Sequence, residues 1–454
     1  MTALAKVSVV IPSWNGRAHL EECLPALAAQ RSPGVPWEIL VLDNGSGDDT
    51  AAWLRRHHPR VRLIESASNV GFAAGANRLA AAAAGEAIAL LNNDTRPEPG
   101  WLGEMVEALG SAPDDVAAVS GLILDWEGER LDFGRGVMTF DGHGFQLDFR
   151  RPLAAVRVPA DREELPFPCG GNVILRRAAL REVAGFDEDY FAYLEDVDLG
   201  WRLWAAGKRV VFARRGVVHH RSAATSRLLG VFNRGFLFER NAFLTVFKNY
   251  EAGLWERVMP AILVTLLART SALLAGNPGG EVLAIDPYAA GVAGRGPAGA
   301  PVGSSPGQAR APSWGQAAGA GRESLAAAVR ERWRRLGPRE FLRRGLRRLA
   351  GGGTGALRAA APSAPLLTDP RTVAQLQAVS FLIGNLDRAT AGRAMTQARR
   401  RRSDQEIFER FPPYLVPTYP GDEGLFAGPG FRSLLPADLP LVEASLAEIM
   451  AVGE

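Results

Sequence analysis

The sequence predicts an α/β fold in its first half and a largely helical, partly disordered extension after it. Short apolar runs alternate with amphipathic segments between Lys6 and Leu91, and polar residues follow each apolar run directly. This alternation is typical of a parallel sheet with helices on both faces. A stretch rich in Gly, Ala, Pro and Ser at 276–321 then separates this part of the chain from the C-terminal part.

Each element is predicted from its own pattern. Strands are expected where β-branched and large apolar residues run together, and helices where apolar residues recur every three or four positions. The expected order is a strand at 7–11, a helix at 17–30, a strand at 37–42, a helix at 48–57, a strand at 61–65, an alanine-rich helix at 73–84 and a strand at 87–91. Further extended segments are expected at 209–212 and 217–220, and a packed helix at 376–386.

The 454 residues, 47% of them hydrophobic, are enough for a sizeable core and more than one domain. Four regions are expected: an α/β domain at 1–250, an amphipathic or apolar helix at 251–275, the linker at 276–321 and a basic helical region at 322–454. The two cysteines, Cys23 and Cys169, show no metal-type spacing, and the N-terminal apolar run is too short for a signal peptide. We therefore expect a protein of the reducing cytoplasm.

The charge is unevenly distributed. The net charge is only +3, but arginines are concentrated between Arg322 and Arg402. This asymmetry predicts an anionic neighbour, for which a lipid-phosphate acceptor or the inner face of the plasma membrane suffices; the clusters lack the interleaved aromatics expected of a nucleic-acid surface. Pro260 and Arg269 interrupt the apolar run at 255–275, so packing against the body is favoured over a position in the membrane interface.

Four polar loops are expected to meet at one edge of the sheet, because ligands of such sheets bind at the carboxyl ends of the strands. They are 12–15, 43–48, 68–72 and 92–95. Asp43 ends an apolar strand, where its carboxylate can accept a hydrogen bond from a nucleobase or a ribose hydroxyl, while Asp48 is better explained as a helix cap. Glycines between Asn69 and Asn77 allow close approach of the backbone to a ligand.

Two further features carry chemistry. Asp94 follows a buried strand, and a hard carboxylate there suits a divalent cation that bridges phosphates. His219 and His220 lie on an extended segment, so they point to opposite faces and at most one is expected to reach the site.

The segment 185–202 packs six carboxylates among aromatic and apolar residues. At helical spacing its apolar residues face a core, while Glu195, Asp196 and Asp198 crowd the helix start. A carboxylate held against apolar surface is a candidate general base; alternatively, these acids only cap the helix.

Five motifs, at 7–15, 41–48, 69–77, 91–97 and 185–199, resemble the family-two inverting glycosyltransferases. More narrowly, they resemble the rhamnosyltransferase and galactofuranosyltransferase-like branch, over residues 6–226. The resemblance implies a GT-A fold, which is a Rossmann-like mixed sheet with helices on both faces. It also implies a nucleoside-diphosphate sugar donor and a divalent metal, Mn or Mg.

The residues and the resemblance together nominate a site. Asp196 is expected to be the base, with Glu195 beside it. The candidate donor-nucleotide contacts are Pro12, Ser13, Asn15, Asp43, Asn69, Gly75, Asn92 and Asn93; the candidate metal ligands are Asp94, His220 and His219; the candidate sugar or acceptor contacts are Trp101, Gly170, Gly171 and Asp198. Asn92 departs from the family pattern, because it stands where the first acid of the Asp-X-Asp motif is expected.

The implied function is transfer of a sugar, with rhamnose favoured, to a hydroxyl of a glycan or polyprenyl-linked acceptor in bacterial cell-wall or surface polysaccharide synthesis. Two alternatives remain. A nucleotidyltransferase would need a basic glycine-rich loop after the first strand, and Pro-Ser-Trp-Asn-Gly at 12–16 contains no lysine. A non-catalytic scaffold at the membrane predicts a degenerate site, whereas Asp43, Asp94, Asp196 and His220 are all present.

Overall fold

The computed structural model describes residues 4–221, 230–276, 370–419 and 421–451. All of them belong to one compact unit, formed by residues 1–283 together with 362–454. The described residues of the C-terminal region, expected as a basic helical region at 322–454, therefore belong to the same compact unit as the α/β domain. Residues 277–321 of the predicted linker and the arginines at 322–348 lie outside the described residues.

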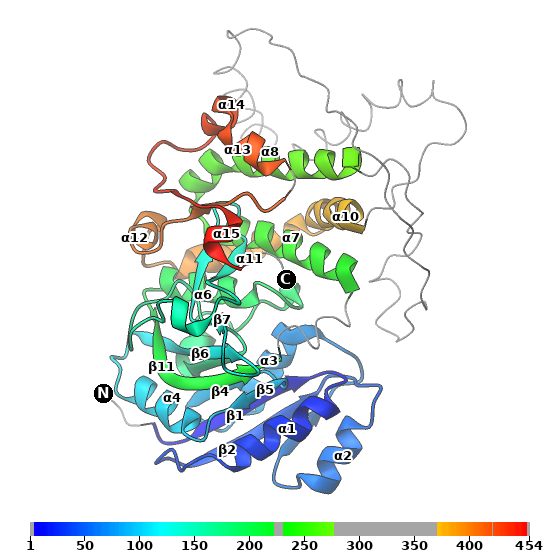
Figure 1. The fold of residues 1–454 in the computed structure, drawn as a ribbon, viewed down its shortest axis with the longest axis vertical. Coiled ribbons are helices and arrows are strands. Elements are labelled where there is room, and N and C mark those ends of the chain that lie inside the picture. Colours follow the sequence, from blue (N-terminus) through cyan, green and yellow to red (C-terminus); the bar gives the residue numbers. More distant parts are fainter. Residues whose placement is uncertain (1–3, 222–229, 277–369, 420, 452–454) are drawn as a thin grey trace, which may run out of the picture. The chain divides into compact units, whose positions relative to one another are not determined.

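Within the described residues, nine strands form the main sheet in the order β3-β2-β1-β4-β10-β6-β11-β5, with β7 paired to β6 (Figure 1). Their bounds are β1 Val7–Ser13, β2 Trp37–Asp43, β3 Arg62–Glu65, β4 Ala87–Leu91, β5 Thr95–Pro97, β6 Val116–Asp125, β7 Leu131–Phe133, β10 Asn172–Arg176 and β11 Arg209–His220. Strands β1 to β4 pair in parallel, as the alternation predicts, and β10 enters antiparallel to β4 and β6. The sheet is therefore mixed, which confirms the predicted fold class.

The strand register brings the predicted site loops together. Ser13 pairs with Asp43 at the ends of β1 and β2, and Leu91 at the end of β4 pairs with Asn172 at the start of β10. His220 at the end of β11 pairs with Thr95, directly after Asp94. Strands β1 and β4 are buried along their whole lengths, so their polar chemistry begins where they end.

The described part of the first half contains six α-helices, of which the first three lie close to their predicted bounds. They are α1 Arg17–Ala28, α2 Thr50–His57, α3 Gly71–Ala82, α4 Trp101–Gly110, α5 Arg177–Glu182 and α6 Glu195–Ala205, with 3₁₀ turns at η1 Leu153–Ala155 and η2 Glu188–Tyr190 and a hairpin of β8 Arg135–Met138 and β9 Gly144–Leu147. Helix α6 begins at Glu195 and buries Val197, Leu199 and Leu203, as the helical spacing predicts.

The C-terminal half is mainly helical. Its elements are α7 Gly230–Asn249, α8 Ala252–Gly276, α10 Pro370–Gly384, α11 Leu386–Arg399, α12 Asp404–Phe408, α13 Asp422–Ala427, α14 Pro429–Arg432 and α15 Leu446–Ile449, with a short parallel pair of β12 Tyr414–Leu415 and β13 Val442–Glu443. Helices α10 and α11 pack against α7, and α7 packs against α6 (Figure 1). The later part of the chain therefore supports the helix that carries the acidic motif.

Two arginines of the cluster at 399–402 bind the protein itself. Arg402 donates hydrogen bonds to the carbonyls of Trp204 (3.3 Å), Gly207 (3.0 Å) and Lys208 (2.6 Å), at the C-terminal end of α6. Arg400 pairs with Asp404 at 2.9 Å. The sequence predicts an anionic neighbour for this cluster, and the structure corrects that interpretation for these two side chains, because their guanidinium groups satisfy internal carbonyls and a carboxylate.

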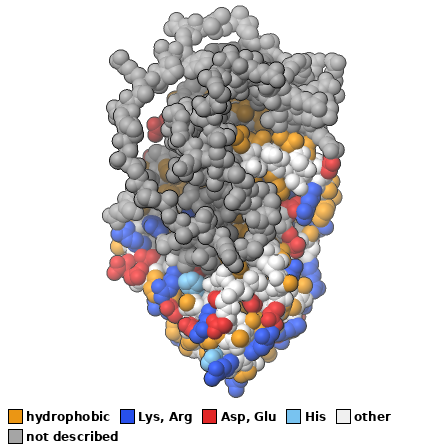
Figure 2. All heavy atoms as spheres, turned by 90° about the vertical axis from the view of Figure 1, so that its right-hand side faces the viewer, with side chains coloured by type: hydrophobic (Ala, Val, Ile, Leu, Met, Phe, Trp, Pro, Cys, Tyr) orange, Lys and Arg blue, Asp and Glu red, His pale blue; other side chains and the backbone are white. Residues whose placement is uncertain are grey.

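No helix in the described ranges is long and apolar enough to cross a membrane. Helix α8, the strongest apolar candidate, carries Pro260 inside it and buries Arg269 in an ion-pair cluster. On the face that Figure 2 shows, basic and acidic side chains are interspersed over the part that is not drawn in grey.

Candidate active site

The loops after β1, β2 and β3 are joined by their own side chains. Asp43 is buried, and its Oδ1 accepts a hydrogen bond from the backbone of Ser46 at 3.1 Å. Asn15 adopts a positive φ of 49°, donates its backbone N–H to the Ser46 hydroxyl (2.9 Å) and accepts from Gly47 (2.7 Å). These contacts form a polar rim at the edge of the sheet, where a nucleotide was expected.

Asn69 supports the start of α3. Its Oδ1 accepts hydrogen bonds from the Asn44 amide (3.0 Å) and from the backbone of Gly71 (2.9 Å). Gly71 has φ +85°, and a Cβ there would lie 2.6 Å from the carbonyl oxygen of Phe191, so glycine is required by both conformation and space.

Gly75, a candidate contact of the donor nucleotide, has a packing role. A Cβ at Gly75 would meet Leu42 Cδ2 at 3.0 Å and Pro12 Cβ at 3.5 Å. Glycine therefore lets α3 lie close against β1 and β2. Pro12 itself is buried in β1, and Ser13 accepts a hydrogen bond from the Asn93 amide at 2.9 Å.

Asp94 and His220 lie side by side, as a shared metal site requires. The Nε2 atom of His220 is 3.2 Å from Asp94 Oδ1, and its Nδ1 is 3.1 Å from Asp132 Oδ2. Although burial opposes both shifts, the hydrogen bonds from His220 lower the pKa of Asp94, and Asp132 and Asp94 raise the pKa of His220 to about 10. A carboxylate that fixes one imidazole nitrogen while the other faces a metal is the usual arrangement of a histidine ligand.

This donor set fits a divalent cation only with ligands from outside the chain. Among the described residues, no group of three or more His, Cys, Asp or Glu side chains is placed to hold a metal. His219, the alternative ligand, points elsewhere, because its Nε2 lies 3.5 Å from Glu98. Asp94 and His220 leave the remaining positions to phosphate oxygens or water, which hard cations readily accept.

Glu195, which is buried, and Asp196, which is partly buried, form a carboxylate pair at the start of α6. Asp196 accepts backbone hydrogen bonds from Gly170 at 3.0 Å and Val197 at 2.9 Å. Glu195 is 7% exposed, and its Oε2 has no hydrogen-bond partner within the described part of the chain. Burial raises the pKa of both carboxyls, and the charge of Asp196 raises the pKa of Glu195 further.

Gly170 and Gly171 bring this pair close to the end of β4. A Cβ at Gly170 would lie 3.2 Å from the ring of Phe72 and 3.7 Å from Glu195 Oε1. A Cβ at Gly171 would lie 3.0 Å from the amide nitrogen of Asn92. The two glycines thus allow the side chains of Phe72, Glu195 and Asn92 to lie close to the backbone of residues 170–171.

Two acceptor candidates lie in the interior, and the structure corrects their assignment. Trp101 is fully buried and donates its indole N–H to Asn172 at 2.8 Å. Asp198 is also fully buried, and it pairs with Arg202 (2.7 Å) and Lys248 (3.2 Å). Neither side chain reaches a surface on which an acceptor could bind.

The sequence analysis missed Asp132. It is buried in β7 between Leu131 and Phe133, and it orients His220 through the contact at 3.1 Å. A lone acid between two large apolar residues in a short strand was the available signal, but its partner lies 88 positions away and only the folded chain reveals the pair.

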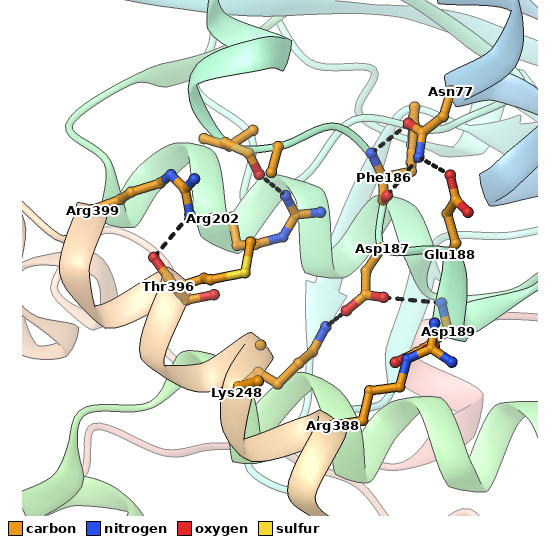
Figure 3. Close-up of a pocket in the computed structure, with 15 residues that line it drawn as sticks. Asn77, Phe186, Asp187, Glu188, Asp189, Arg202, Lys248, Arg388, Thr396 and Arg399 are labelled. Carbon is orange, nitrogen blue, oxygen red and sulfur yellow. Dashed lines mark hydrogen bonds and ion pairs between the residues drawn. The ribbon is translucent and has the colours of Figure 1, made fainter. Parts of the chain in front are cut away.

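A cavity of about 390 Å³ lies between α11 and the segment around η2 (Figure 3). Its charged groups are already paired: Lys248 contacts Asp187, and Arg388 lies 2.5 Å from Asp189. None of the predicted site residues lines it. The cavity is therefore separate from the candidate active site.

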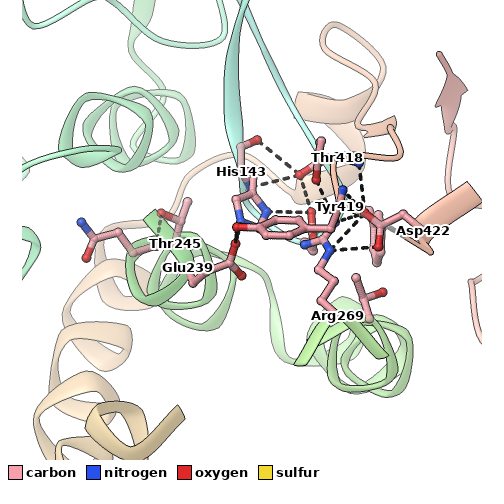
Figure 4. Close-up of polar contacts among 12 residues, drawn as sticks. His143, Glu239, Thr245, Arg269, Thr418, Tyr419 and Asp422 are labelled. Carbon is pink, nitrogen blue, oxygen red and sulfur yellow. Dashed lines mark hydrogen bonds and ion pairs between the residues drawn. The ribbon is translucent and has the colours of Figure 1, made fainter. Parts of the chain in front are cut away.

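A second group of buried charges joins four segments (Figure 4). His143 lies between Asp141 (3.2 Å) and Glu239 (3.3 Å), while Arg269 bridges Asp141 (2.9 Å) and Asp422 (3.0 Å). The adjacent cavity of about 20 Å³ has room for a water molecule but not for a substrate. We interpret this group as a clamp that fastens the β8–β9 loop, α7, α8 and the C-terminal segment to one another.

Comparison with known proteins agrees with these features. The family model described as glycosyl transferase family 2 matches residues 8–184. N-acetylglucosaminyl-diphospho-decaprenol L-rhamnosyltransferase from Mycobacterium tuberculosis is 30% identical over 240 residues, which cover 48% of this chain and 77% of that protein. The O-antigen biosynthesis protein RfbC from Myxococcus xanthus is 32% identical over 228 residues, 48% of this chain and 18% of that protein.

Among solved structures, GalNAc-T7 with UDP, GalNAc and Mn2+ is similar, with a TM-score of 0.45 and 15% sequence identity. The similarity covers 57% of this chain and 51% of that one.

Proposed function

Because the chain belongs to glycosyl transferase family 2, we propose that it is an inverting glycosyltransferase. It moves a sugar, with rhamnose favoured, from a nucleoside-diphosphate donor to a hydroxyl of a glycan or lipid-linked acceptor. The printed activity of the mycobacterial relative supports both the sugar and the lipid-linked acceptor, and RfbC supports a place in surface polysaccharide synthesis.

One observation carries the proposal. The Glu195–Asp196 pair lies at the same edge of the sheet as the polar rim around Asp43, and Gly170 and Gly171 adjoin it. A partly buried carboxylate with a raised pKa, which accepts a hydrogen bond from the backbone of Gly170, is suited to take a proton from a hydroxyl.

The reaction is a single displacement. Asp196 accepts the proton of the acceptor hydroxyl as its oxygen forms a bond to the anomeric carbon. The bond from that carbon to the diphosphate breaks on the opposite side, so the configuration inverts and the nucleoside diphosphate leaves with the bonding electrons. Glu195, whose pKa is raised by burial and by Asp196, keeps its proton and leaves a single negative charge on the pair.

The remaining residues bind and orient the donor. Asp43 and Asn69 face the nucleoside at the rim, and Asn92 lies against Gly171 beside the sugar. A divalent cation held by Asp94 and His220 would neutralise charge on the diphosphate. Asn92 supplies no second anion there, so we expect the cation to bind weakly without the diphosphate.

The test measures nucleoside diphosphate release from dTDP-rhamnose, UDP-galactose, UDP-galactofuranose, UDP-glucose, UDP-N-acetylglucosamine and GDP-mannose, each with Mn2+, Mg2+ or EDTA. We expect release from one donor that EDTA abolishes. Asp196→Asn should lower turnover by about 10²–10⁴-fold, the usual contribution of a general base, while calorimetry shows unchanged donor binding.

Glu182→Gln is the matched control, since Glu182 is a partly exposed carboxylate on α5 that pairs with Lys208, and we expect its turnover to equal that of the wild type. Undiminished transfer by Asp196→Asn would disprove the assignment of the base. If no donor releases nucleoside diphosphate and no donor binds, the alternative of a non-catalytic scaffold is favoured.

A further inference from the structure

The turn that precedes the catalytic pair has an unusual backbone. Phe191 has φ 62° and ψ −65°, and the N–H of Ala192 donates to the carbonyl of Tyr190 at 2.7 Å, which closes a tight three-residue turn. Tyr193 (φ 70°) and Leu194 (φ 61°) then adopt left-handed conformations. Residues other than glycine rarely adopt such backbone conformations, so contacts with the surrounding residues must stabilise them. Glu195 follows directly, and the turn therefore sets where α6 begins.

Asn241 on α7 holds this turn from one side. The side chain is fully buried, and its amide nitrogen lies within hydrogen-bond distance of three carbonyls, those of Tyr190 (3.0 Å), Ala192 (2.9 Å) and Tyr193 (2.7 Å). Its amide oxygen accepts a hydrogen bond from Arg240 Nε at 2.9 Å, which fixes the direction in which the nitrogen points. A single side chain thus binds the carbonyl groups on which the turn depends.

Two other helices complete the support. The first amides of α3, those of Phe72 and Ala73, donate to the carbonyl of Phe191 at 2.6 and 3.2 Å. Ala374 and Ala378 of α10 form a small core with α7, against which the side chains of residues 191–193 pack. The turn is therefore enclosed by α3, α7 and α10, and α7 and α10 lie beyond the residues that the family model matches.

We propose that Asn241 is a positioning residue, which holds the 190–194 turn so that Asp196 meets the acceptor hydroxyl. The inference rests on the proposed role of Asp196. Asn241 is too deeply buried to touch substrate, so it acts only through the turn. A displacement of a catalytic group by about 1 Å can cost on the order of 100-fold in rate, which is why the turn matters for turnover and not only for folding.

The test uses the full chain with Asn241→Leu, which keeps the number and branching of the side-chain heavy atoms but removes the hydrogen bonds. We expect turnover to fall about 10–100-fold while calorimetry shows the donor dissociation constant within about twofold of the wild type. Val246→Ala is the matched control, because Val246 is equally buried on α7 and has no contact with the turn among those described. It should lower the melting temperature but leave turnover per folded molecule unchanged.

Asn241→Ser is made in parallel, because the smaller change keeps one donor and protects against failure to fold. It should give turnover between the wild type and Asn241→Leu. If Asn241 acts through Asp196, then Asn241→Leu or Asn241→Ser causes no further loss when combined with Asp196→Asn, since effects that act through one group are not additive.

The positioning role would be overturned if Asn241→Leu turned over as fast as Val246→Ala. It would also be overturned if the loss in the double variant equalled the product of the losses in Asn241→Leu and Asp196→Asn. These results are distinguishable from failure of the proposed function, in which Asp196→Asn alone would retain transfer.

Discussion

Two parts of helix α6 treat buried carboxylates in opposite ways. Glu195 and Asp196 adjoin each other in its first turn, and the hydrogen bonds that Asp196 accepts there come from backbone amides. Burial raises the pKa of both carboxyls. Two residues beyond Asp196, Asp198 is more deeply buried, yet Arg202 and Lys248 overcome the effect of burial and lower its pKa to about 2. Burial is common to both, and the presence of cations makes the difference.

The difference separates a functional acid from a structural one. A buried carboxylate with two cations stays ionised and fixes its neighbours, whereas one without cations is left ready to exchange a proton. The sequence shows all three acids within four positions and cannot separate them, because Lys248 lies 50 residues away on α7.

The largest expected effect is on the free energy of unfolding, and it tests the difference between Asp198 and Glu195. Asp198→Asn removes the buried carboxylate that pairs with both Arg202 and Lys248 and leaves Lys248 with Asp187 alone, and we expect it to lower the free energy of unfolding by about 3–5 kcal/mol. Glu195→Gln removes a carboxyl whose ionisation burial opposes, so its free energy of unfolding should be unchanged or higher at neutral pH. Urea denaturation of both variants measures the two effects.

A similar loss of stability in both variants would break the comparison, since it would mean that Glu195 is also held by favourable charge interactions.

The second effect concerns the clamp around His143. Although burial opposes protonation, Asp141 and Glu239 raise the pKa of His143 from 6.5 to about 9. Because the folded pKa exceeds the unfolded value, the stabilisation is complete below pH 6.5 and is lost as the pH rises towards 9. The loss is about 1.4 kcal/mol for each pKa unit of the shift.

Thermal denaturation between pH 6 and 9.5 measures this loss, and His143→Gln should flatten the profile. The other charged groups facing His143 keep their charge in this range, because the pKa values of Asp141 and Glu239 are lowered and that of Arg269 is raised. An unchanged slope in the variant would assign the pH dependence to another group.

The smallest effect concerns the geometry of the same clamp. Arg269→Lys keeps the positive charge but loses the forked contact with Asp141 and Asp422, and we expect a loss of about 1–2 kcal/mol. Limited proteolysis should then cut the C-terminal segment around Asp422 faster than in the wild type. Equal cleavage rates would show that charge alone, without the fork, fastens this segment.

Much of the fold follows from local patterns. The strand at 87–91 has the predicted bounds, and the helices α1, α2 and α3 lie within two residues of theirs at nearly every end. The spacing of apolar residues predicts these elements because each element buries one face or its whole length. The antiparallel entry of β10 and the docking of 370–451 could not be read in this way, since both depend on pairings between distant residues.

The site divides in the same manner. The sequence predicts that Asp94 and one of two adjacent histidines share a metal, and the structure places Asp94 beside His220. Asp132 and Asn241 act through contacts with distant residues, which no local pattern predicts. Gly75 and Asp198 lie within the sequence motifs and Trp101 lies shortly after one, and in the structure all three contribute to packing or charge balance. The place of a residue in a motif does not show whether it binds substrate itself or supports another residue that does.

The contact of Arg402 with the end of α6 has a consequence for synthesis of the chain. Arg402 donates to the carbonyl of Lys208, 194 positions earlier. At about 5–20 residues per second, a ribosome needs about 10–40 s to cover that distance. During this interval the carbonyls of Gly207 and Lys208 lack these hydrogen bonds, so the turn that follows α6 gains this support late, well after the last strand of the main sheet has been made.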